Sequence, residues 1–313
     1  MAHNAFFVTT ARLSILLTCF CMTAFASGES TAEEKKLIVC STTQVADLTR
    51  QIVGDRCEVR CVLAAGQDPH TYEPGNDDLL SVGKADLCIR NGWNLEGNAW
   101  MKNMADTAGK KLITCVTGIQ PRQMEEHGET IKDPHAWLTP KNALKYAENI
   151  RDGVIELEPG HTNEFNMRFE CLRLQLLSLD RWIRQMVGQI PGNSRVLITH
   201  HDAFGYFCES YGFETFSPVG WSTGELSEVS IAQRQSIIKQ IRERGVPTVF
   251  VETSTNKELL EGIAKDAGVT VGQTLYSDAM GPEGSAGESY IGMMRENVIR
   301  IVGGLAPKTA SGS

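Results

Sequence analysis

Two copies of the tripeptide Asp-Pro-His stand out in the sequence, at Asp68–His70 and at Asp133–His135. Proline fixes its own backbone angle and restricts the residue before it. A histidine that directly follows such a pair is held on a stiff segment of backbone, which suits a metal ligand. One loop histidine alone is more often an ordinary surface residue, but two in the same local context favour metal binding.

Further candidate ligands lie in the second half of the chain. His200, His201 and Asp202 follow an apolar run that predicts a strand, and Asp278 follows another short strand. Sites in α/β proteins form at the carboxyl ends of strands. Asp202 could instead cap a helix expected to begin at Ala203, and Asp278 considered alone also fits an ordinary turn.

The first half of the sequence alternates between predicted strands and predicted helices, which is typical of a parallel α/β sheet. The apolar runs predict strands at Lys36–Cys40, Val59–Leu63, Leu87–Arg90 and Leu112–Val116. Helical spacing of apolar residues predicts helices at Thr42–Val53 and Asp77–Gly83.

One long amphipathic helix is predicted over Thr162–Val187, a stretch without glycine or proline that is bounded by Pro-Gly pairs. Beyond it the alternation resumes, with strands predicted at Arg195–Thr199, Thr248–Val251 and Val269–Val271 and helices at Ile231–Arg244 and Ser289–Val302. We therefore expect an α/β fold of two parallel-sheet lobes joined by one long rigid helix, with the metal site in the cleft between the lobes. The expected divisions are an N-terminal lobe at 32–160, a connecting helix at 161–190 and a C-terminal lobe at 191–308.

Composition and the amino terminus limit the possible partners and compartment. The chain has 313 residues, of which 22% are charged, and its net charge of −8 argues against a nucleic-acid partner. The apolar run Leu13–Ala26 ends in Ala-Phe-Ala, so residues 1–26 resemble a secretory signal peptide and predict a periplasmic protein. Cys19 follows Thr18 rather than a small residue such as glycine or alanine, which makes a lipid anchor the less favoured alternative.

Seven cysteines remain after the predicted cleavage, so at least one has no partner within the chain. The sequence contains no C-x-x-C, and a zinc site built from thiolates is therefore unsupported. Two interpretations stay open: the cysteines are small buried core residues, or one disulfide forms and involves Cys57.

Seven segments in a fixed order resemble the zinc/manganese solute-binding proteins of bacterial ABC importers. They are GQDPHTYEP (66–74), NGWNLEGNAW (91–100), DPHAWLTP (133–140), THHDAFGYF (199–207), STGELSEVS (222–230), VFVETS (249–254) and LYSDAMG (275–281). This resemblance implies a metal held between the two lobes by His70, His135, His201 and Asp278. His200 precedes the matching segment and would replace His201 only if the local register shifted.

Three imidazoles and one carboxylate fit the resemblance chemically, since this set can enclose zinc tetrahedrally, and a bidentate carboxylate also suits manganese. Histidine at position 201 favours zinc, because many manganese-binding members of the family that this sequence resembles have glutamate at that position. The segment 123–129 is shorter than the histidine-rich loop of many zinc importers, which weakens that assignment. Glu252 could orient a ligand histidine or be no more than a satisfied carboxylate in the cleft.

The function implied is an extracytoplasmic carrier that captures zinc or manganese and delivers it to a membrane permease. We expect a monomer, and a metal affinity that falls as the pH drops through the histidine range near 6.5. A zinc-dependent hydrolase is the alternative, but four protein ligands leave no open position on the metal. A surface adhesin is a third possibility, for which the sequence offers no repeat or added module.

Overall fold

The structure is a computed structural model that describes residues 1, 34–126, 129–222 and 229–307. Lys35–Ser313 form one compact unit, to which the following description applies. The predicted signal peptide and Cys19 lie outside the described residues. Within the described ranges, none of the helices combines the length and apolar character needed to cross a membrane.

The first lobe contains a four-stranded parallel sheet with the order β2-β1-β3-β4. Its strands are β1 (Lys36–Cys40), β2 (Cys57–Cys61), β3 (Leu87–Arg90) and β4 (Leu112–Thr114). In the central strand, Ile38 pairs with Val59 on one side and with Leu87 on the other. Because the strands are parallel, their carboxyl ends meet at one edge of the sheet, where the segments that follow them can converge.

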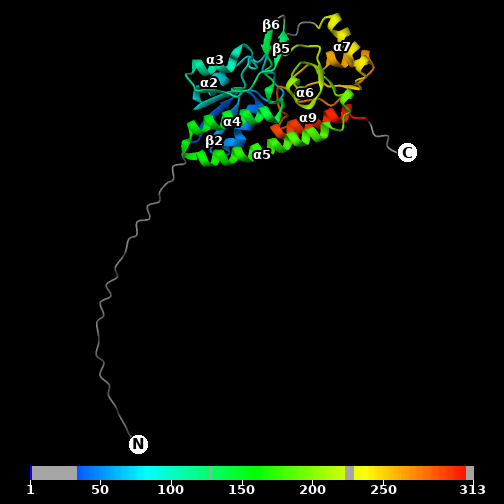
Figure 1. The fold of residues 1–313 in the computed structure, drawn as a ribbon. Coiled ribbons are helices and arrows are strands. Elements are labelled where there is room, and N and C mark those ends of the chain that lie inside the picture. Colours follow the sequence, from blue (N-terminus) through cyan, green and yellow to red (C-terminus); the bar gives the residue numbers. More distant parts are fainter. Residues whose placement is uncertain (2–33, 127–128, 223–228, 308–313) are drawn as a thin grey trace. The chain divides into compact units, whose positions relative to one another are not determined.

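Alternate residues of β1 pack into different hydrophobic clusters. Ile38 and Cys40 join the cluster that contains helix α1 (Thr43–Val53), whereas Leu37 and Val39 join the cluster that contains α2 (Asn76–Lys84) and α3 (Trp100–Thr107). Side chains of a strand alternate between faces, so both faces of this sheet are covered, as expected for a parallel sheet. Figure 1 shows α2 and α3 on the opposite side of the lobe from α4 (Pro140–Leu157).

The second lobe is built on two parallel strand pairs. They are β7 (Val196–Ile198) with β8 (Glu214–Phe216), and β9 (Thr248–Val249) with β10 (Thr270–Val271). A parallel bridge between Thr199 and Phe250 joins the two pairs, and another links Glu252 to Leu275. The helices of this lobe are α6 (Gly205–Tyr211), α7 (Ile231–Arg244), α8 (Glu258–Ala267) and α9 (Tyr290–Leu305).

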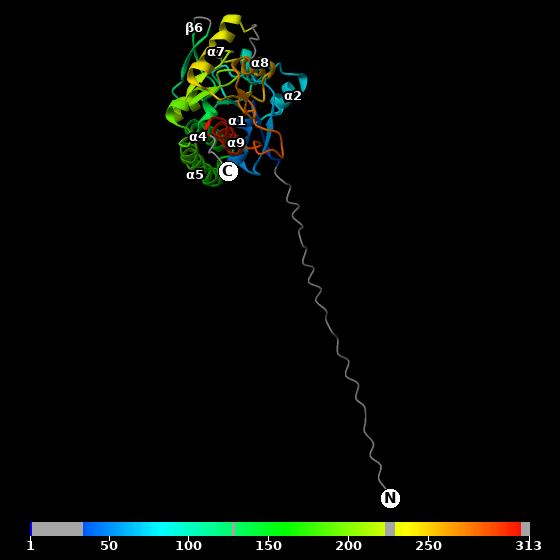
Figure 2. The same ribbon diagram turned by 90° about the vertical axis from the view of Figure 1, so that its right-hand side faces the viewer.

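Helix α5 (Thr162–Val187) connects the lobes over 26 residues, a length of about 39 Å at about 1.5 Å per residue. It packs against α1 and α4 of the first lobe and against α9 of the second. Figure 1 shows it running along the base of both lobes, and in Figure 2 it lies below α4. Its buried side is apolar and consists of Phe165, Phe169, Leu172, Leu176, Leu179, Ile183 and Val187. The described residues therefore confirm two α/β lobes joined by one long helix.

Several short elements complete the chain. An antiparallel hairpin of β5 (Gln123–Glu126) and β6 (Glu129–Lys132) lies between β4 and α4 in the sequence. Four single 3₁₀ turns occur in the described ranges, at Gly97–Ala99, Ala136–Leu138, Pro159–His161 and Gly192–Ser194. The first two of these turns lie within the segments 91–100 and 133–140 that the sequence singled out.

The sequence predicted the elements unevenly. The helices at 162–187 and 231–244 and the strand at 87–90 are confirmed. The strand expected at 59–63 occupies 57–61 instead, because it is an edge strand in which Glu58 and Arg60 face solvent, so the apolar run did not mark its start. Helices α3, α4 and α8, strand β8 and the hairpin were not predicted.

The helix expected from Ala203 begins two residues later, at Gly205, and no side chain caps it. Asp202 therefore does not cap this helix, and that interpretation is wrong. Its backbone amide donates to the oxygen of Gly220, and its carboxylate lies 3.5 Å from Nη1 of Arg122. An ion pair with a distant arginine has taken the place of a local cap.

All seven cysteines expected in the mature chain are free thiols in the structure. Cys57, which the sequence left open for a disulfide, is buried and unpaired. Five of the seven are buried, Cys61 is half-buried and Cys171 is exposed. Burial raises the pKa of the Cys57 and Cys88 thiols to about 11, so these side chains behave as small apolar core residues.

Candidate metal centre

His70 lies in the loop that follows β2, and neighbouring segments fix the backbone of this loop. The His70 amide donates to Oδ1 of Asp68 at 2.8 Å. The oxygen of Pro69 accepts from the Gly97 amide at 3.2 Å and from Nε1 of Trp100 at 3.0 Å. The two segments at 66–74 and 91–100 thus act together, since the second anchors the first.

His135 is fully buried at the end of the second Asp-Pro-His segment. Its Nδ1 lies 2.8 Å from Oδ1 of Asp133, which also accepts the His135 amide at 3.0 Å. This pairing directs Nε2 toward the cleft and fixes the tautomer, as carboxylates commonly do for ligand histidines. The proline of this segment predicted its stiffness, but the contact made by Asp133 was not predicted, although Asp133 and His135 are only two residues apart in the sequence.

His201 follows β7 and is also fully buried. Its Nδ1 lies 2.7 Å from Oε2 of Glu252, whose Oε1 accepts the amides of His200 and His201 at 2.9 and 3.1 Å. Of the two interpretations of Glu252, the structure supports contact with a histidine of the cluster. His200 lies outside the cluster, so no shift of register occurs.

Asp278 is held in a loop that both lobes support. Ser254 Oγ donates to Oδ2 of Asp278 at 3.2 Å from within the second lobe. From the first lobe, Nε1 of Trp137 donates to the oxygen of Ser277 at 3.2 Å, and Thr43 Oγ1 accepts the Met280 amide at 2.9 Å. The position of Asp278 therefore depends on the first lobe as much as on its own.

The four predicted residues come together in one buried cluster, in which one ligand atom from each lies within 4.8 Å of the others. Nε2 of His135 lies 3.3 Å from Nε2 of His70 and 3.4 Å from Oδ1 of Asp278. Nε2 of His70 lies 3.7 Å from the same Oδ1, and Nε2 of His201 lies 3.2 Å from Oδ2 of Asp278. A tetrahedron with bonds of about 2.0–2.1 Å has edges of about 3.3–3.4 Å, so these separations match a zinc-sized centre.

The electrostatics of the cluster also fit a cation. Burial lowers the pKa of His70, whereas at His135 it is outweighed by the nearby carboxylates of Asp133 and Asp278, which raise that pKa to about 9. Burial is likewise outweighed at His201, where Glu252 and Asp278 raise the pKa well above its usual range. At Asp278 burial opposes ionisation, but His201 and His135 hold the pKa well below its usual range. The carboxylate is thus ionised at neutral pH, and an entering cation replaces protons on imidazole.

Access to the cluster is restricted. The side chains of His135, His201 and Asp278 are 0% exposed and that of His70 is 1% exposed. The Trp221 ring packs edge-on against His70, with ring centroids 5.1 Å apart. Asp278 Oδ1 is buried without a hydrogen-bond partner in the described part of the chain, as expected for an atom that binds a metal ion.

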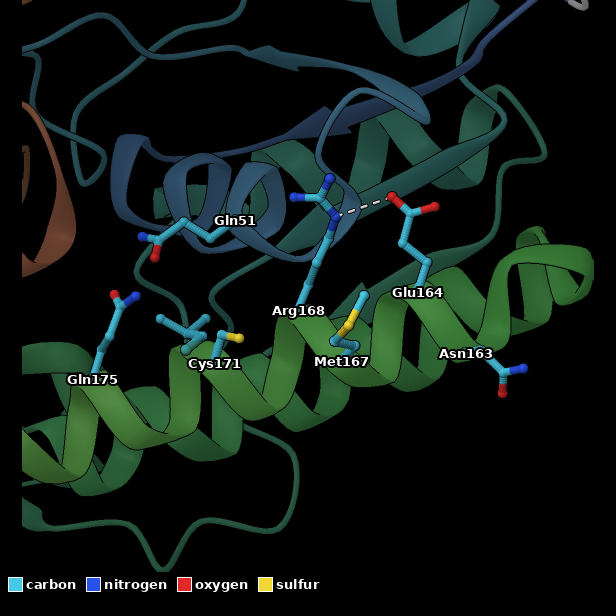
Figure 3. A pocket seen from close by; sticks show the side chains of 8 residues that line it. Gln51, Asn163, Glu164, Met167, Arg168, Cys171 and Gln175 are labelled. Atoms are coloured by element: carbon cyan, nitrogen blue, oxygen red, sulfur yellow. Dashed lines mark hydrogen bonds and ion pairs between the residues drawn. The ribbon is translucent and has the colours of Figure 1, made fainter.

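A separate groove lies between α1 and α5 and is lined by other residues than those of the cluster. Its lining residues are Gln51, Asn163, Glu164, Met167, Arg168, Cys171, Leu172 and Gln175 (Figure 3). Arg168 is paired with Glu164 at 3.2 Å on the same helix. The groove contains none of the four clustered residues, so it is not part of the candidate metal centre.

The chain is similar to known metal-binding proteins. Residues 38–304 match the protein family described as zinc-uptake complex component A, periplasmic. The chain is 34% identical over 282 residues to the manganese-binding lipoprotein MntA of Halalkalibacterium halodurans, which covers 90% of this chain and 92% of that protein. It is 30% identical over 295 residues to the manganese ABC transporter substrate-binding lipoprotein PsaA of Streptococcus pneumoniae, with coverage of 91% and 94%.

The fold has a similar counterpart among solved structures. The periplasmic zinc binding protein TroA from Treponema pallidum superimposes with a TM-score of 0.81 at 31% sequence identity. The match covers 87% of this chain and all of that chain.

Proposed function

Since the chain belongs to the zinc-uptake complex component A (ZnuA) family, we propose that it captures one divalent transition metal ion and delivers it to the permease of an ABC importer. The metal is cargo rather than a resident cofactor, and the function is capture and release without turnover. The proposed ligands are His70, His135 and His201 through Nε2, and Asp278 through its carboxylate.

The observation that carries this proposal is the spacing of the four donor groups. One ligand atom from each of four side chains, distant in sequence, lies within 4.8 Å of the others in a closed interior, and four of the contacts measure 3.2–3.7 Å. Two carboxylates hold the far nitrogens of His135 and His201, which leaves Nε2 of each ring for the ion. Burying ionisable groups costs free energy unless they are paired. A cluster of four such groups is therefore not explained by stabilisation of the protein core.

The same closed set argues against the hydrolase alternative, and nothing in the comparisons supports it. A catalytic zinc keeps a position open for water beside a general base. Here four protein groups would complete a tetrahedron around the ion, and Glu252, the acid beside them, already contacts His201 and accepts from two backbone amides. We therefore expect metal exchange but no hydrolysis of esters, phosphates or peptides.

Zinc and manganese are the expected cargo, and zinc is expected to bind more tightly in a shared site. Three imidazoles suit zinc, and divalent affinities generally place manganese lowest in its series. The carboxylate of Asp278 could supply both oxygens and so add the further bond that manganese accepts. Which ion is carried in the cell then depends on supply.

The location and partners follow from the same proposal. The protein acts outside the cytoplasm, as a periplasmic carrier after removal of residues 1–26, and as a monomer that docks on a membrane permease. The two lobes proposed are residues 32–160 and 191–308, with the connecting helix at 161–190. The relatives named above are lipoproteins, so a lipid anchor at Cys19 is the alternative to cleavage after residue 26.

Calorimetric titration of metal-free protein with zinc and with manganese tests the proposal. One ion should bind per chain, with zinc tighter, and Asp278→Ala should weaken zinc binding at least about a hundredfold, more than the loss of a group behind a ligand costs. Unchanged affinity in Asp278→Ala, or an absence of binding by the unmodified protein, would contradict the proposed site.

A further inference from the structure

Outside the metal cluster, Arg122 is a charged residue that contacts both lobes. It precedes β5 in the first lobe, and its backbone amide donates to the hydroxyl of Tyr206 in α6 at 2.8 Å. The same hydroxyl donates to the backbone oxygen of Asp133 at 3.0 Å. Arg122 therefore lies at a point where the two lobes touch.

The guanidinium of Arg122 bridges carboxylates from both lobes. Nη1 lies 3.1 Å from Asp133 in the first lobe and 3.5 Å from Asp202 in the second, and Nε lies 3.1 Å from Glu209. Among the arginine and lysine ion pairs of the described residues, only the pair with Asp133 includes a fully buried carboxylate. Burial would lower the pKa of Arg122, but Asp202 and Asp133 raise it, so the side chain stays charged.

Both main carboxylates lead directly to proposed ligands. Asp133 uses one oxygen for Arg122 and the other for Nδ1 of His135. Asp202 is the residue after His201 in the chain. A single cation thus connects the segments that carry one histidine from each lobe.

The second lobe also leaves space for this side chain. A Cβ at Gly205, the first residue of α6, would lie 2.4 Å from Cζ of Arg122. Because such a contact is impossible without a shift, the glycine is what allows the guanidinium to lie against the start of α6. The guanidinium therefore lies between the backbone of Gly205 in the second lobe and the buried carboxylate of Asp133 in the first.

We infer that Arg122 is a positioning residue that sets the separation of His135 and His201 and thereby slows release of the bound metal. This inference rests on the proposed function of the cluster. Arg122 does not contact the metal; it acts through Asp133 on the orientation of the His135 ring and through Asp202 on the segment of His201. Without it, Asp133 is a buried carboxylate with one unpaired oxygen, and the two histidine segments lose their shared cation.

The test replaces Arg122 by Gln and by Lys in the full chain, with Arg234→Gln as the control. Arg234 pairs with Asp266 between α7 and α8 and contacts none of the residues at the cluster. Zinc release into excess chelator should be about 10- to 100-fold faster in Arg122→Gln, the range found for groups behind metal ligands. Arg122→Lys should lie between Gln and the unmodified protein, because lysine keeps the charge but lacks the fork, and Arg234→Gln should release zinc at the normal rate.

Two further measurements separate positioning from general stabilisation. The visible absorption of bound Co²⁺ should change in Arg122→Gln, since that spectrum reports ligand geometry and not stability. In a double-mutant cycle, Asp202→Asn should speed zinc release by itself and add little to Arg122→Gln. A normal release rate and Co²⁺ spectrum in Arg122→Gln, or additive effects in the cycle, would overturn the inference even if the melting temperature fell.

The outcomes also distinguish the inference from the function on which it rests. Failure of the unmodified protein to bind zinc would contradict the proposed function. Normal binding by the unmodified protein, together with unaltered variants, would contradict the role of Arg122 alone. If Arg122→Gln does not fold, the release rates of Arg122→Lys and Asp202→Asn decide, and normal rates in both would overturn the inference.

Discussion

At the level of single residues, the metal centre depends on which of two adjacent histidines faces the cleft. His201 belongs to the cluster and is paired with Glu252, whereas His200 does not belong to it. Both are buried, so replacing either removes a ring of the same size from nearly the same place in the chain. This gives a matched pair of variants.

We predict that His201→Ala weakens zinc binding at least about a hundredfold, because it removes a ligand and leaves Glu252 without its partner. His200→Ala should bind zinc with little change in affinity, although it can lower the melting temperature by opening a small cavity. Zinc competition against a chromophoric chelator measures both. Equal losses in the two variants would mean that His201 has no special role.

Protonation of the cluster predicts the pH dependence of metal binding. The His135 pKa of about 9 and the raised His201 pKa mean that these rings carry protons at neutral pH in the metal-free protein. Because zinc must displace these protons, the apparent zinc affinity should rise with pH up to about 9. With ordinary histidine pKa values, the affinity would level off just above about pH 6.5.

Titrations in two buffers of different ionisation enthalpy measure this proton release directly. More than about one proton per zinc should be released at neutral pH, and fewer as the pH approaches 9. Because the raised pKa values stabilise the metal-free fold below about 6.5, that stability should be lost as the pH rises through about 9. An affinity that is constant between about pH 7 and 9 would contradict the assignment of these two rings.

At the level of elements, local signals in the sequence were sufficient to find the candidate ligands but not the contacts that support them. Two Asp-Pro-His segments, a histidine pair after a predicted strand and Asp278 after another marked the candidates, and the family resemblance chose His201 over His200. The contacts made by Asp133, Thr43 and Arg122 could not be predicted, because each joins segments whose relative placement only the folded chain fixes. Helix α4 was missed although proline at its first turn and Thr139, which accepts the Asn142 amide, mark its start.

Close packing between loops gives a prediction at this scale. A Cβ at Gly97 would lie 1.9 Å from the backbone oxygen of His70, so Gly97→Ala must displace one of the two loops. We expect this variant to lose about 1–3 kcal/mol of stability from overpacking and to bind zinc more weakly, because the His70 loop moves.

Gly83→Ala is the matched control, since no atom lies within 4 Å of the added Cβ and the position is exposed on α2. It should bind zinc normally and be at least as stable as the unmodified protein. Thermal unfolding and a zinc titration of both variants check the pair. Normal zinc affinity in Gly97→Ala would show that the segment at 91–100 does not position His70.

At the level of the whole molecule, the two lobes share one hydrophobic core. The main cluster contains Ile38 and Trp137 of the first lobe and Leu197, Phe250 and Ile301 of the second. Helix α5 contributes its apolar face to the same cluster. Because this core continues from one lobe to the other along α5, we expect it to resist wide opening of the lobes. Metal release is then expected to require local movement near His201 or Asp278.

This shared core predicts cooperative unfolding. Denaturant unfolding of the metal-free protein should show one transition, with coincident curves from tryptophan fluorescence and circular dichroism. Zinc should add about 2.7 kcal/mol when its free concentration is about 100 times the Kd, because it binds only the folded state. Two separate transitions would mean that the lobes fold independently and that α5 does not unite them.

The most direct test of the central claim is the position of the metal in a crystal of the zinc-loaded protein, located by anomalous scattering at the zinc edge. The account predicts one strong peak per chain, at about 2.0–2.2 Å from Nε2 of the three cluster histidines and from an Asp278 oxygen. A peak at other residues, or a zinc ion that lacks any of these four ligands, would contradict it.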